Sequence, residues 1–300
     1  MPLLNQKRTL SVTLLSLSLL SANSHAEQNY QTELLVGYEK EDADTSTDKT
    51  TGLSAEIYFS PVNTESKPLA QAAFLDKSSS ATVGYFQSET DLLNSTFNSI
   101  DQSGPLISIN YITEANAFIF GATYSKIDGD TNPNFVEIDG RLAGFSIGKY
   151  LNDSSVINII YKNSEADYRD TASNQTIATL DIDSYELSYN AVQSFDAARY
   201  FRFSAGIELI NKSDSSSVKE DNHELEVLGE YYFSRMTSLG ASAAFNSGDD
   251  VSDEGTTLAI GFTHFFVPQF ALNIELTKFN ADDNQTEDTD SISVVAIARF

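Results

Sequence analysis

Apolar and polar residues alternate along most of the chain in runs of roughly ten residues, and each run ends in a polar or turn-forming segment. Alternation with a period of two is typical of a β-strand whose two faces meet different surroundings, whereas no helix-period segment of any length follows residue 26. The pattern predicts 14 strands, an even number, as a single-chain barrel with both ends on one side requires. The predicted strands are 31–40, 50–59, 80–89, 104–113, 117–126, 136–150, 155–167, 177–192, 199–210, 219–233, 237–246, 256–266, 270–279 and 290–300.

The segments between the predicted strands alternate between long polar connections and tight turns. Bacterial outer-membrane barrels combine long external loops with short periplasmic turns, so the alternation predicts seven external loops and two periplasmic chain ends. A soluble β-sandwich is the alternative, but both of its ends face the same solvent and need no such asymmetry. The long connections are 41–49, 90–103, 127–135, 168–176, 211–218, 247–255 and 280–289, and the short ones are 114–116, 151–154, 194–198, 234–236 and 267–269.

Within single strands the alternation sorts charged residues onto one face. In 270–279, Leu272 and Ile274 point to one side and Glu275 to the other, and 199–210 and 223–233 follow the same rule. Unpaired carboxylates at every second position do not fit a packed core, because burying a lone charge is prohibitive. They suit a wall that faces water, and closing the sheet removes the open edge that lipid does not tolerate. The sequence therefore predicts an all-β fold, a transmembrane antiparallel up-and-down β-barrel of about 14 strands over residues 27–300.

Aromatic residues gather close to the short connections. This position matches the girdle of amphipathic rings at a membrane–water interface, although aromatic residues also favour strand ends in any sheet. The girdle is the interpretation that explains why they cluster at one end of the hairpins. The residues concerned are Tyr58, Phe59, Tyr111, Phe118, Tyr150, Phe195, Tyr200, Phe201, Tyr231, Tyr232, Phe233, Phe265, Phe266 and Phe270.

The first 26 residues have the features of a secretory signal peptide. Lys7 and Arg8 precede an apolar segment at 10–22, and Ser24-His25-Ala26 resembles a cleavage site. An N-terminal anchor helix is the alternative, but the apolar segment is too short to span a bilayer. We therefore expect an exported protein. Since the chain has no Cys, it carries neither a lipid-modified cysteine nor a disulfide.

The charge balance excludes one class of partner. Removing residues 1–26 leaves 16 basic against 43 acidic residues, a formal charge of −27. Such a chain repels nucleic acid. No run of 18 apolar residues is present, which rules out a helical membrane protein. It does not rule out a barrel, because barrel strands dilute their apolar residues by alternation.

The end of the chain carries a one-sided apolar pattern. Ile292, Val294, Ala296, Ala298 and the terminal Phe300 fall on one face of the last predicted strand. This resembles the C-terminal signature of bacterial outer-membrane barrels. The resemblance implies recognition by the barrel-assembly machinery.

One connection, Ser60–Lys77, is too long for a periplasmic turn. Tyr58-Phe59-Ser60-Pro61-Val62 and Lys67–Leu75 (KPLAQAAFL) resemble a segment of a family of proteobacterial outer-membrane porins. The resemblance implies passive or weakly selective passage of solutes and no catalytic residues. We expect Leu69–Leu75 to form a short helix or folded turn that packs under the mouth of the barrel.

Two histidines remain after residue 26, and neither fits a known barrel enzyme. His223 with Asp221 at a strand end would suit an omptin-like rim protease, but no companion motif accompanies them, and a solvated rim histidine is the simpler interpretation. His264 lies among aromatic residues and is interpreted as an interfacial side chain. A barrel lipase needs Ser two residues from His on one face, and neither histidine has one. The sequence thus predicts a protein that is not an enzyme and has no cofactor.

A metal site is indicated only by one acidic segment. Asp128, Asp130, Asn132 and Asp139 occupy positions 1, 3, 5 and 12 of a calcium-binding loop, but Pro133 replaces the sixth-position glycine on which its turn depends. A solvated acidic loop is the simpler interpretation. The acidic clusters at 41–44, 249–254 and 282–290 could hold divalent ions that bridge to lipopolysaccharide in the outer leaflet.

The function that these observations favour is a pore for small hydrophilic solutes. A 14-stranded barrel is wide enough to hold water, and an acidic excess in the lumen attracts cations, so we expect modest cation preference. A non-conducting structural or adhesive barrel is the alternative, and the rim protease is a remoter one. No residue marks a subunit interface, so a homo-oligomer stays open. The residues expected in the lumen are Glu56, Glu186, Glu208, Glu224, Glu226, Glu230, Glu275, Lys162, Arg202 and Arg299.

Overall fold

The computed structural model describes residues 29–93, 95, 97–196, 198–215, 219–248, 254–282 and 287–300. The expected signal peptide, 1–26, lies outside these residues, as do Asp249, Asp250, Asp253 and Asp283 of the acidic clusters. In the described part of the chain no helix is long and apolar enough to cross a membrane.

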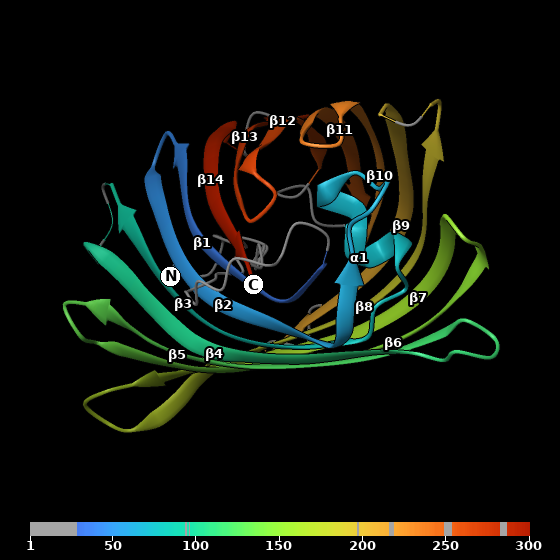
Figure 1. Ribbon diagram of the computed structural model, residues 1–300. Coiled ribbons are helices and arrows are strands. Elements are labelled where there is room, and N and C mark those ends of the chain that lie inside the picture. The colour runs from blue at the N-terminus through green and yellow to red at the C-terminus, as the bar shows by residue number, and fades with distance from the viewer. Residues whose placement is uncertain are drawn as a thin grey trace.

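Fourteen antiparallel strands close into one barrel, in which each strand pairs with its sequence neighbours and β1 pairs with β14 (Figure 1). The sequence prediction of a 14-stranded up-and-down barrel is thus confirmed. Two short helices, η1 (Leu69–Gln71) and α1 (Ala72–Leu75), interrupt the strands. The strands are β1 (Asn29–Ala43), β2 (Ser46–Asn63), β3 (Ser80–Leu92), β4 (Ser99–Ile112), β5 (Phe118–Asn132), β6 (Val136–Asn152), β7 (Ser155–Asp170), β8 (Gln175–Ser194), β9 (Tyr200–Asp214), β10 (Lys219–Ser234), β11 (Thr237–Gly248), β12 (Gly255–Val267), β13 (Phe270–Ala281) and β14 (Thr289–Arg299).

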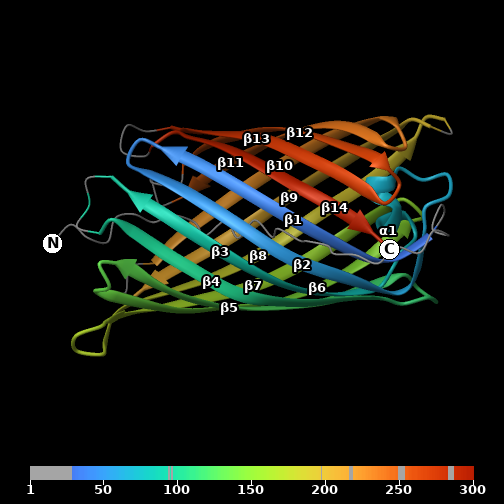
Figure 2. The same cartoon turned by 60° about the vertical axis from the view of Figure 1, so that its left-hand side comes forward.

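The barrel has two unlike mouths. The proximal mouth is the end at which β1 begins and β14 ends. There the main-chain oxygen of Phe300 accepts hydrogen bonds from the main-chain nitrogens of Gln31 and Thr32 on β1, at 2.6 and 3.0 Å. The distal mouth carries the connections that follow β1, β3, β5, β7, β9, β11 and β13. In the side view, α1 lies at the proximal mouth beside the C-terminus (Figure 2).

The predicted bounds of the long connections at the distal mouth are wrong, because the strands extend into them. Segment 41–49 was expected as a loop, yet β1 runs to Ala43 and β2 starts at Ser46, and 127–135 is likewise strand as far as Asn132. The physical reason is that hairpins continue beyond the apolar belt with polar side chains on their outer face, where water solvates them. One-sided hydrophobicity is lost there, but the backbone hydrogen-bond ladder persists.

The outer surface of the barrel is apolar. Val36, Leu53 and Ile107 are 49%, 48% and 57% exposed, and Phe145 is 64% exposed. Because the side chains of a strand alternate, the residues between them point inward. An apolar belt outside and polar side chains inside is the arrangement of a barrel surrounded by lipid.

Only some of the aromatic residues near the short connections form the predicted outer girdle, and the others face the inside of the barrel. Phe59, Phe233 and Phe266 are more than half exposed on the outside, as predicted. Their neighbours Tyr58, Tyr232 and Phe265 are 3%, 1% and 1% exposed and point inward, as do Tyr150 and Tyr200. Adjacent strand residues must face opposite sides, so an aromatic pair places one ring in the lipid interface and one inside the mouth.

Candidate functional site

Carboxylates line the lumen on β8, β9 and β10. Glu186, Glu208 and Glu224 are consecutive partners in the strand register, so they form one row across three strands. Their outward-facing neighbours Leu187, Ile207 and Leu225 are 46%, 43% and 48% exposed, which fixes the glutamates on the inner face. Two more carboxylates, Glu226 on β10 and Glu275 on β13, interact with each other electrostatically. We call these five glutamates the acidic belt.

One lysine lies within the acidic belt. The Nζ atom of Lys162 on β7 is 3.4 Å from Oε2 of Glu186 and 3.2 Å from Oε1 of Glu208. Within the described residues, Glu224, Glu226 and Glu275 have no ion pair. The belt therefore keeps a negative excess that faces the lumen.

Closer to the proximal mouth, Arg202 and Glu230 form a second, more tightly held group. Nη1 of Arg202 is 3.6 Å from Oε2 of Glu230. The Glu230 carboxylate also accepts hydrogen bonds from Ser238 Oγ and the Tyr232 hydroxyl, each at 2.6 Å. These contacts fix the charges against the wall, so Glu230 is half of a local pair rather than a free charge in the lumen.

Glu56 and Arg299 point inward but do not line open lumen. Arg299 is 4% exposed, and its Nε donates to Oε2 of Glu33 at 2.5 Å. The guanidinium carbon lies 4.4 Å from the ring centroid of Tyr30 and 4.7 Å from that of Phe265. Glu56 accepts from Ser80 Oγ at 2.6 Å and from Tyr58 at 3.0 Å. Both residues lie beneath the segment that fills the proximal mouth.

The connection between β2 and β3 spans 64–79, because β2 continues to Asn63 and so includes the first residues of the predicted connection Ser60–Lys77. We call residues 64–78 of this connection the plug. It folds into the barrel as η1 and α1, in agreement with the predicted short helix under the mouth, and Figure 1 shows it inside the ring of strands. Leu69 and Ala72 are 2% and 1% exposed. Burying one leucine side chain contributes about 2 kcal/mol.

Apolar side chains of the plug contact strands on all sides of the mouth. Leu69 packs against Phe265 and Ala271 of β12 and β13, and Ala72 packs in the cluster of Tyr30 and Tyr58 of β1 and β2. On the opposite side, Phe74 lies 5.5 Å from the ring of Tyr150 and joins the cluster formed by Val192, Tyr200 and Tyr232. The inward aromatic residues thus form the surface on which the plug packs.

Hydrogen bonds join the main chain of the plug to the barrel wall. Arg235, between β10 and β11, accepts from the Leu69 nitrogen at 2.8 Å and donates through Nε to the Lys67 oxygen at 2.9 Å. Its Nη2 donates to the oxygen of Thr64. Further tethers join Tyr200 to the Ser66 oxygen (2.6 Å), Tyr150 to the Phe74 oxygen (2.8 Å) and Arg299 to the Leu69 oxygen (2.8 Å). The plug is therefore attached to the wall on several sides.

Two turn carboxylates at the proximal mouth have shifted pKa values. Lys77 of the plug donates to Oδ1 of Asp153 at 2.8 Å, and this contact lowers the pKa of Asp153. Asp196 accepts from the main-chain nitrogens of Ala198 and Arg199 and pairs with the Arg199 side chain, which lowers its pKa to about 2. The first contact joins the plug to the wall, and the second stays within one turn.

Sequence reasoning missed the residues that hold the plug. Arg235 had no role in the predictions, and the inward aromatic residues were assigned to the girdle. Only the aromatic pairs Tyr58-Phe59, Tyr200-Phe201, Tyr232-Phe233 and Phe265-Phe266 carried a usable signal, because one member of each pair must face inward.

The proposed assembly pattern lies on the outer face of β14. Ile292 is 40% exposed, and Val294, Ala296 and Ala298 share its face, while Arg299 points the other way. Ala298, Ala296 and Val294 are register partners of Leu34, Val36 and Tyr38 on β1. The pattern thus borders the seam at which the barrel closes.

The calcium-loop hypothesis does not fit the observed backbone. Asp128 and Asp130 lie on β5 and Asp139 on β6, with Asp128 and Asp139 as cross-strand partners and Asn132 as the last residue of β5. A calcium loop curls its ligands around one ion, which extended strands do not do. Lys126 pairs with Asp128 at 2.5 Å, and the described residues contain no group of three or more potential metal ligands of the His, Cys, Asp or Glu type.

Both histidines lie on the outside of the barrel. His223 shares the outer face of β10 with Asp221 and is the register partner of Leu209 and Ser247. It therefore does not face the inside of the mouth, where the rim-protease hypothesis requires it. The ring of His264 lies 4.9 Å from that of Phe266, and its Nδ1 is 2.9 Å from Thr237 Oγ1, as expected for an interfacial residue.

Comparisons with known proteins agree with this architecture. A family model described as "Putative general bacterial porin" matches residues 6–300. The fold is similar to that of the outer membrane protein Omp33 of Acinetobacter baumannii, at 19% identity over 91% of this chain and 100% of that chain, with a TM-score of 0.56. It is also similar to the toluene transporter TodX of Pseudomonas putida, at 10% identity over 94% of each chain, with a TM-score of 0.51. At such identities the likeness concerns the fold alone. No curated protein sequence matches the chain.

Proposed function

Because the chain belongs to the family of general bacterial porins and is an outer-membrane channel protein, we propose that it passes small hydrophilic solutes with a modest preference for cations. The proximal mouth then faces the periplasm and the distal mouth faces outward. The observation that carries this proposal is the acidic belt, whose five carboxylates face the lumen with Lys162 among them and Arg202 near Glu226.

A lumen wall of one predominant charge, enclosed by protein and lipid of low dielectric constant, raises the local concentration of counter-ions and depletes co-ions. Lys162 neutralises part of the charge of Glu186 and Glu208, while Glu224, Glu226 and Glu275 keep theirs in the described part of the chain. The net effect favours cations without excluding anions.

The reversal potential of the purified protein in planar bilayers tests this preference. Under a KCl gradient, the sign of the potential should indicate that K⁺ is more permeable than Cl⁻. Replacing Glu224 and Glu226 by Gln should move the potential towards zero. Glu137→Gln, on the outward face of β6, removes a charge outside the lumen and serves as control. A potential of zero, or one of anionic sign, in the unmodified protein contradicts the proposal.

The plug supports a second part of the proposal, that the proximal mouth is the narrowest part of the path. It is tethered by Arg235, Tyr200, Tyr150 and Arg299, so solutes must pass between it and the wall or wait for it to move. Conductance should therefore be low in the native protein and higher when residues 64–78 are replaced by a short Gly-Ser turn. The exclusion size for sugars should rise in the same variant.

The same plug is the observation that favours the alternative, a non-conducting structural or adhesive barrel. That alternative predicts no conductance from the native protein and none from the plug-replacement variant, although both migrate as folded, heat-modifiable barrels. Conductance that appears when the plug is replaced favours the porin.

Partners follow from the same arrangement. We expect the barrel-assembly machinery to recognise Ile292, Val294, Ala296, Ala298 and Phe300 on the outward face of β14. We expect divalent ions at the acidic clusters 41–44, 249–254 and 282–290 to bridge the protein to lipopolysaccharide. A homo-oligomer stays a prediction that cross-linking in membranes can test.

A further inference from the structure

In the distal half of the barrel, the apolar residues of four neighbouring strands occupy inward-facing positions. Nearer the middle of the same strands, the apolar residues occupy outward-facing positions. On β8, Tyr185 and Leu187 face outward and are 48% and 46% exposed. Further along the same strand, Leu180 and Ile182 have the opposite parity and therefore face the lumen. Asp181 and Asp183 face outward there and accept hydrogen bonds from Asn163 at 2.8 and 3.2 Å.

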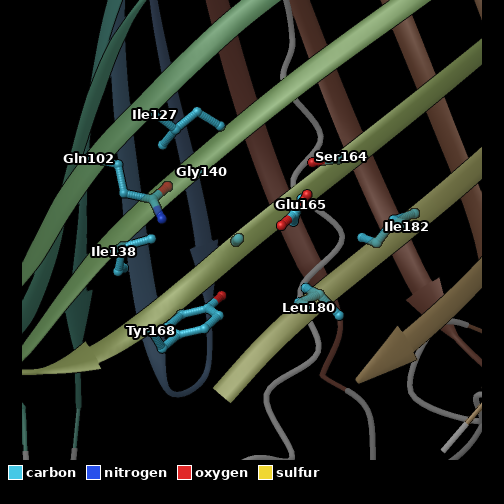
Figure 3. Close-up of a pocket in the computed structure, with 10 residues that line it drawn as sticks. Gln102, Ile127, Ile138, Gly140, Ser164, Glu165, Tyr168, Leu180 and Ile182 are labelled. Carbon is cyan, nitrogen blue, oxygen red and sulfur yellow. The ribbon is translucent and has the colours of Figure 1, made fainter. Parts of the chain in front are cut away.

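The neighbouring strands repeat this switch. Ile127 on β5 and Ile138 on β6 face inward and are 6% and 5% exposed, and Tyr168 on β7 is the register partner of Ile138. Figure 3 shows these side chains gathered around one recess. We call Ile127, Ile138, Tyr168, Leu180 and Ile182 the apolar wall.

Such a wall is unexpected in a water-filled lumen. The lumen-facing side chains of a conducting barrel are polar. Ile127 and Ile138 are buried, whereas Tyr168, Leu180 and Ile182 are partly exposed, and an apolar patch that faces water is typical of a binding surface. The outward residues at the same height are charged, so the wall cannot be explained by lipid contact on the other side of the sheet.

The apolar wall adjoins the acidic belt. Ser164 on β7 is the register partner of Ile182, and Lys162 follows on the same face of β7 two residues away. On β8, Ile182 and Glu186 share a face four residues apart, roughly 13 Å along the strand. On the other side, Leu180 and Ile182 are the register partners of Asp214 and Lys212 on β9, and Lys212 is in turn the register partner of Glu220 on β10. A solute in the distal lumen therefore meets an apolar surface and an acidic surface at once.

We propose that the distal lumen binds amphiphilic organic cations, in which a positively charged nitrogen is joined to an aliphatic or aromatic group. The apolar group packs on the apolar wall, and the cationic nitrogen is directed towards the acidic belt. The inference rests on the proposed function in that it takes the lumen to be the solute path. Inorganic cations would bind only at the acidic belt, and neutral apolar solutes would bind only at the apolar wall.

Inhibition of K⁺ current in planar bilayers tests this assignment with three probes. Benzyltrimethylammonium should inhibit at about tenfold lower concentration than tetramethylammonium, the ratio that burial of roughly 55 Å² of apolar surface produces. Benzyl alcohol, which has the ring and no charge, should inhibit less than benzyltrimethylammonium. Equal inhibition by the two ammonium ions overturns the proposal, as does stronger inhibition by the alcohol.

Substitutions in the apolar wall and in the acidic belt show which surface binds which part of the probe. Leu180→Ser should abolish the difference between the two ammonium ions and leave the reversal potential in a KCl gradient unchanged. Glu224→Gln should weaken the inhibition by both ammonium ions by a similar factor. Val295→Ser makes a similar apolar-to-polar change on the inward face of β14 and should alter neither quantity. A change with Val295→Ser as large as that with Leu180→Ser contradicts the role of the wall.

Binding to the folded protein in deuterated detergent keeps the test independent of conduction. Saturation-transfer NMR should show transfer to the ring protons of benzyltrimethylammonium in the native protein and little in the Leu180→Ser variant. If the barrel does not conduct but this difference is found, the proposed function fails and the binding site stands. If the barrel conducts with cation preference and the difference is absent, the binding site fails alone.

Discussion

Arg235 and Leu69 are joined through their main chains, with the Leu69 nitrogen donating to the Arg235 oxygen at 2.8 Å. The Arg235 side chain completes a clamp by donating through Nε to the oxygen of Lys67 at 2.9 Å. This turn between β10 and β11 thus holds the first turn of the plug from the opposite wall.

Arg235→Ala should loosen the plug without unfolding the barrel. The variant keeps the main-chain bond to Leu69 but leaves the oxygens of Thr64 and Lys67 without the guanidinium donor. The loss of charge-assisted hydrogen bonds costs about 1.5–3 kcal/mol each, enough to raise the open population by tenfold or more. Single-channel recordings should show more frequent or larger openings.

A matched variant controls for a general effect of removing an arginine. Arg199→Ala removes an arginine that pairs with Asp196 in another proximal turn and does not touch the plug. Its conductance should equal that of the native protein. Equal conductance in the Arg235→Ala variant and the native protein contradicts the clamp.

Arg299→Met should destabilise the barrel strongly. Arg299 and Glu33 have side chains only 5% and 11% exposed, so the substitution leaves a buried carboxylate without its cation. Breaking a buried pair from one side costs about 3–5 kcal/mol. Equilibrium unfolding in denaturant, followed by heat-modifiable migration, measures the loss.

The double variant Glu33→Gln, Arg299→Met distinguishes charge from packing. It removes both charges and should be more stable than the Arg299→Met variant, because no uncompensated charge remains. If the double variant is less stable than the single one, the pair acts mainly through the contacts of Arg299 with Tyr30, Phe265 and the Leu69 oxygen.

Lys162→Gln should increase cation preference. Its ammonium group neutralises part of the charge of Glu186 and Glu208, so its removal makes the acidic belt more negative. The K⁺ to Cl⁻ permeability ratio, obtained from the reversal potential, should rise about twofold or more. A fall in the ratio would mean that Lys162 does not face the ion path.

The pKa of Asp153 should report whether the plug is docked. Its contact with Lys77 lowers the pKa below the ordinary 3.8, so the ionised form is bound more tightly in the docked state. This stabilising contribution is present above pH 3.8 and is lost as pH falls through the lowered value. In the Arg235→Ala variant the carboxyl titration, followed by NMR, should move up towards 3.8.

Asp196 supplies the internal control for that titration. Its pKa is lowered to about 2 by hydrogen bonds within its own turn, without contact with the plug. It should titrate at the same pH in both proteins. A shift of both carboxylates together would indicate a change in the whole proximal mouth instead of undocking.

Phe300→Ser should impair assembly in cells more than folding in the test tube. If the outward pattern of β14 is read by the assembly machinery, the variant accumulates less in the outer membrane. The main-chain bonds of residue 300 to Gln31 and Thr32 do not need the ring, so refolding into detergent should be nearly unchanged. Equal losses in both measurements would make Phe300 a structural residue only.

Several features follow from the sequence alone because they depend on local periodicity. One lipid-facing side per strand forces a period of two, which is why the 14 strands and the inward positions of Glu186, Glu208 and Glu224 could be predicted. The folded turn at 69–75 was also predictable, because it was the one proximal connection too long to be tight.

Tertiary structure alone decided how the two mouths are built. Period two shows which residues share a face, but it does not show what covers that face or where the lipid belt ends. Tyr58, Tyr232 and Phe265 face the plug only because the chain folds back inside the ring, and Arg235 reaches Lys67 across 168 positions of sequence. Likewise, Leu180 and Ile182 form part of a lumen wall only because β8 continues beyond the membrane, where water replaces lipid outside and the apolar face turns inward.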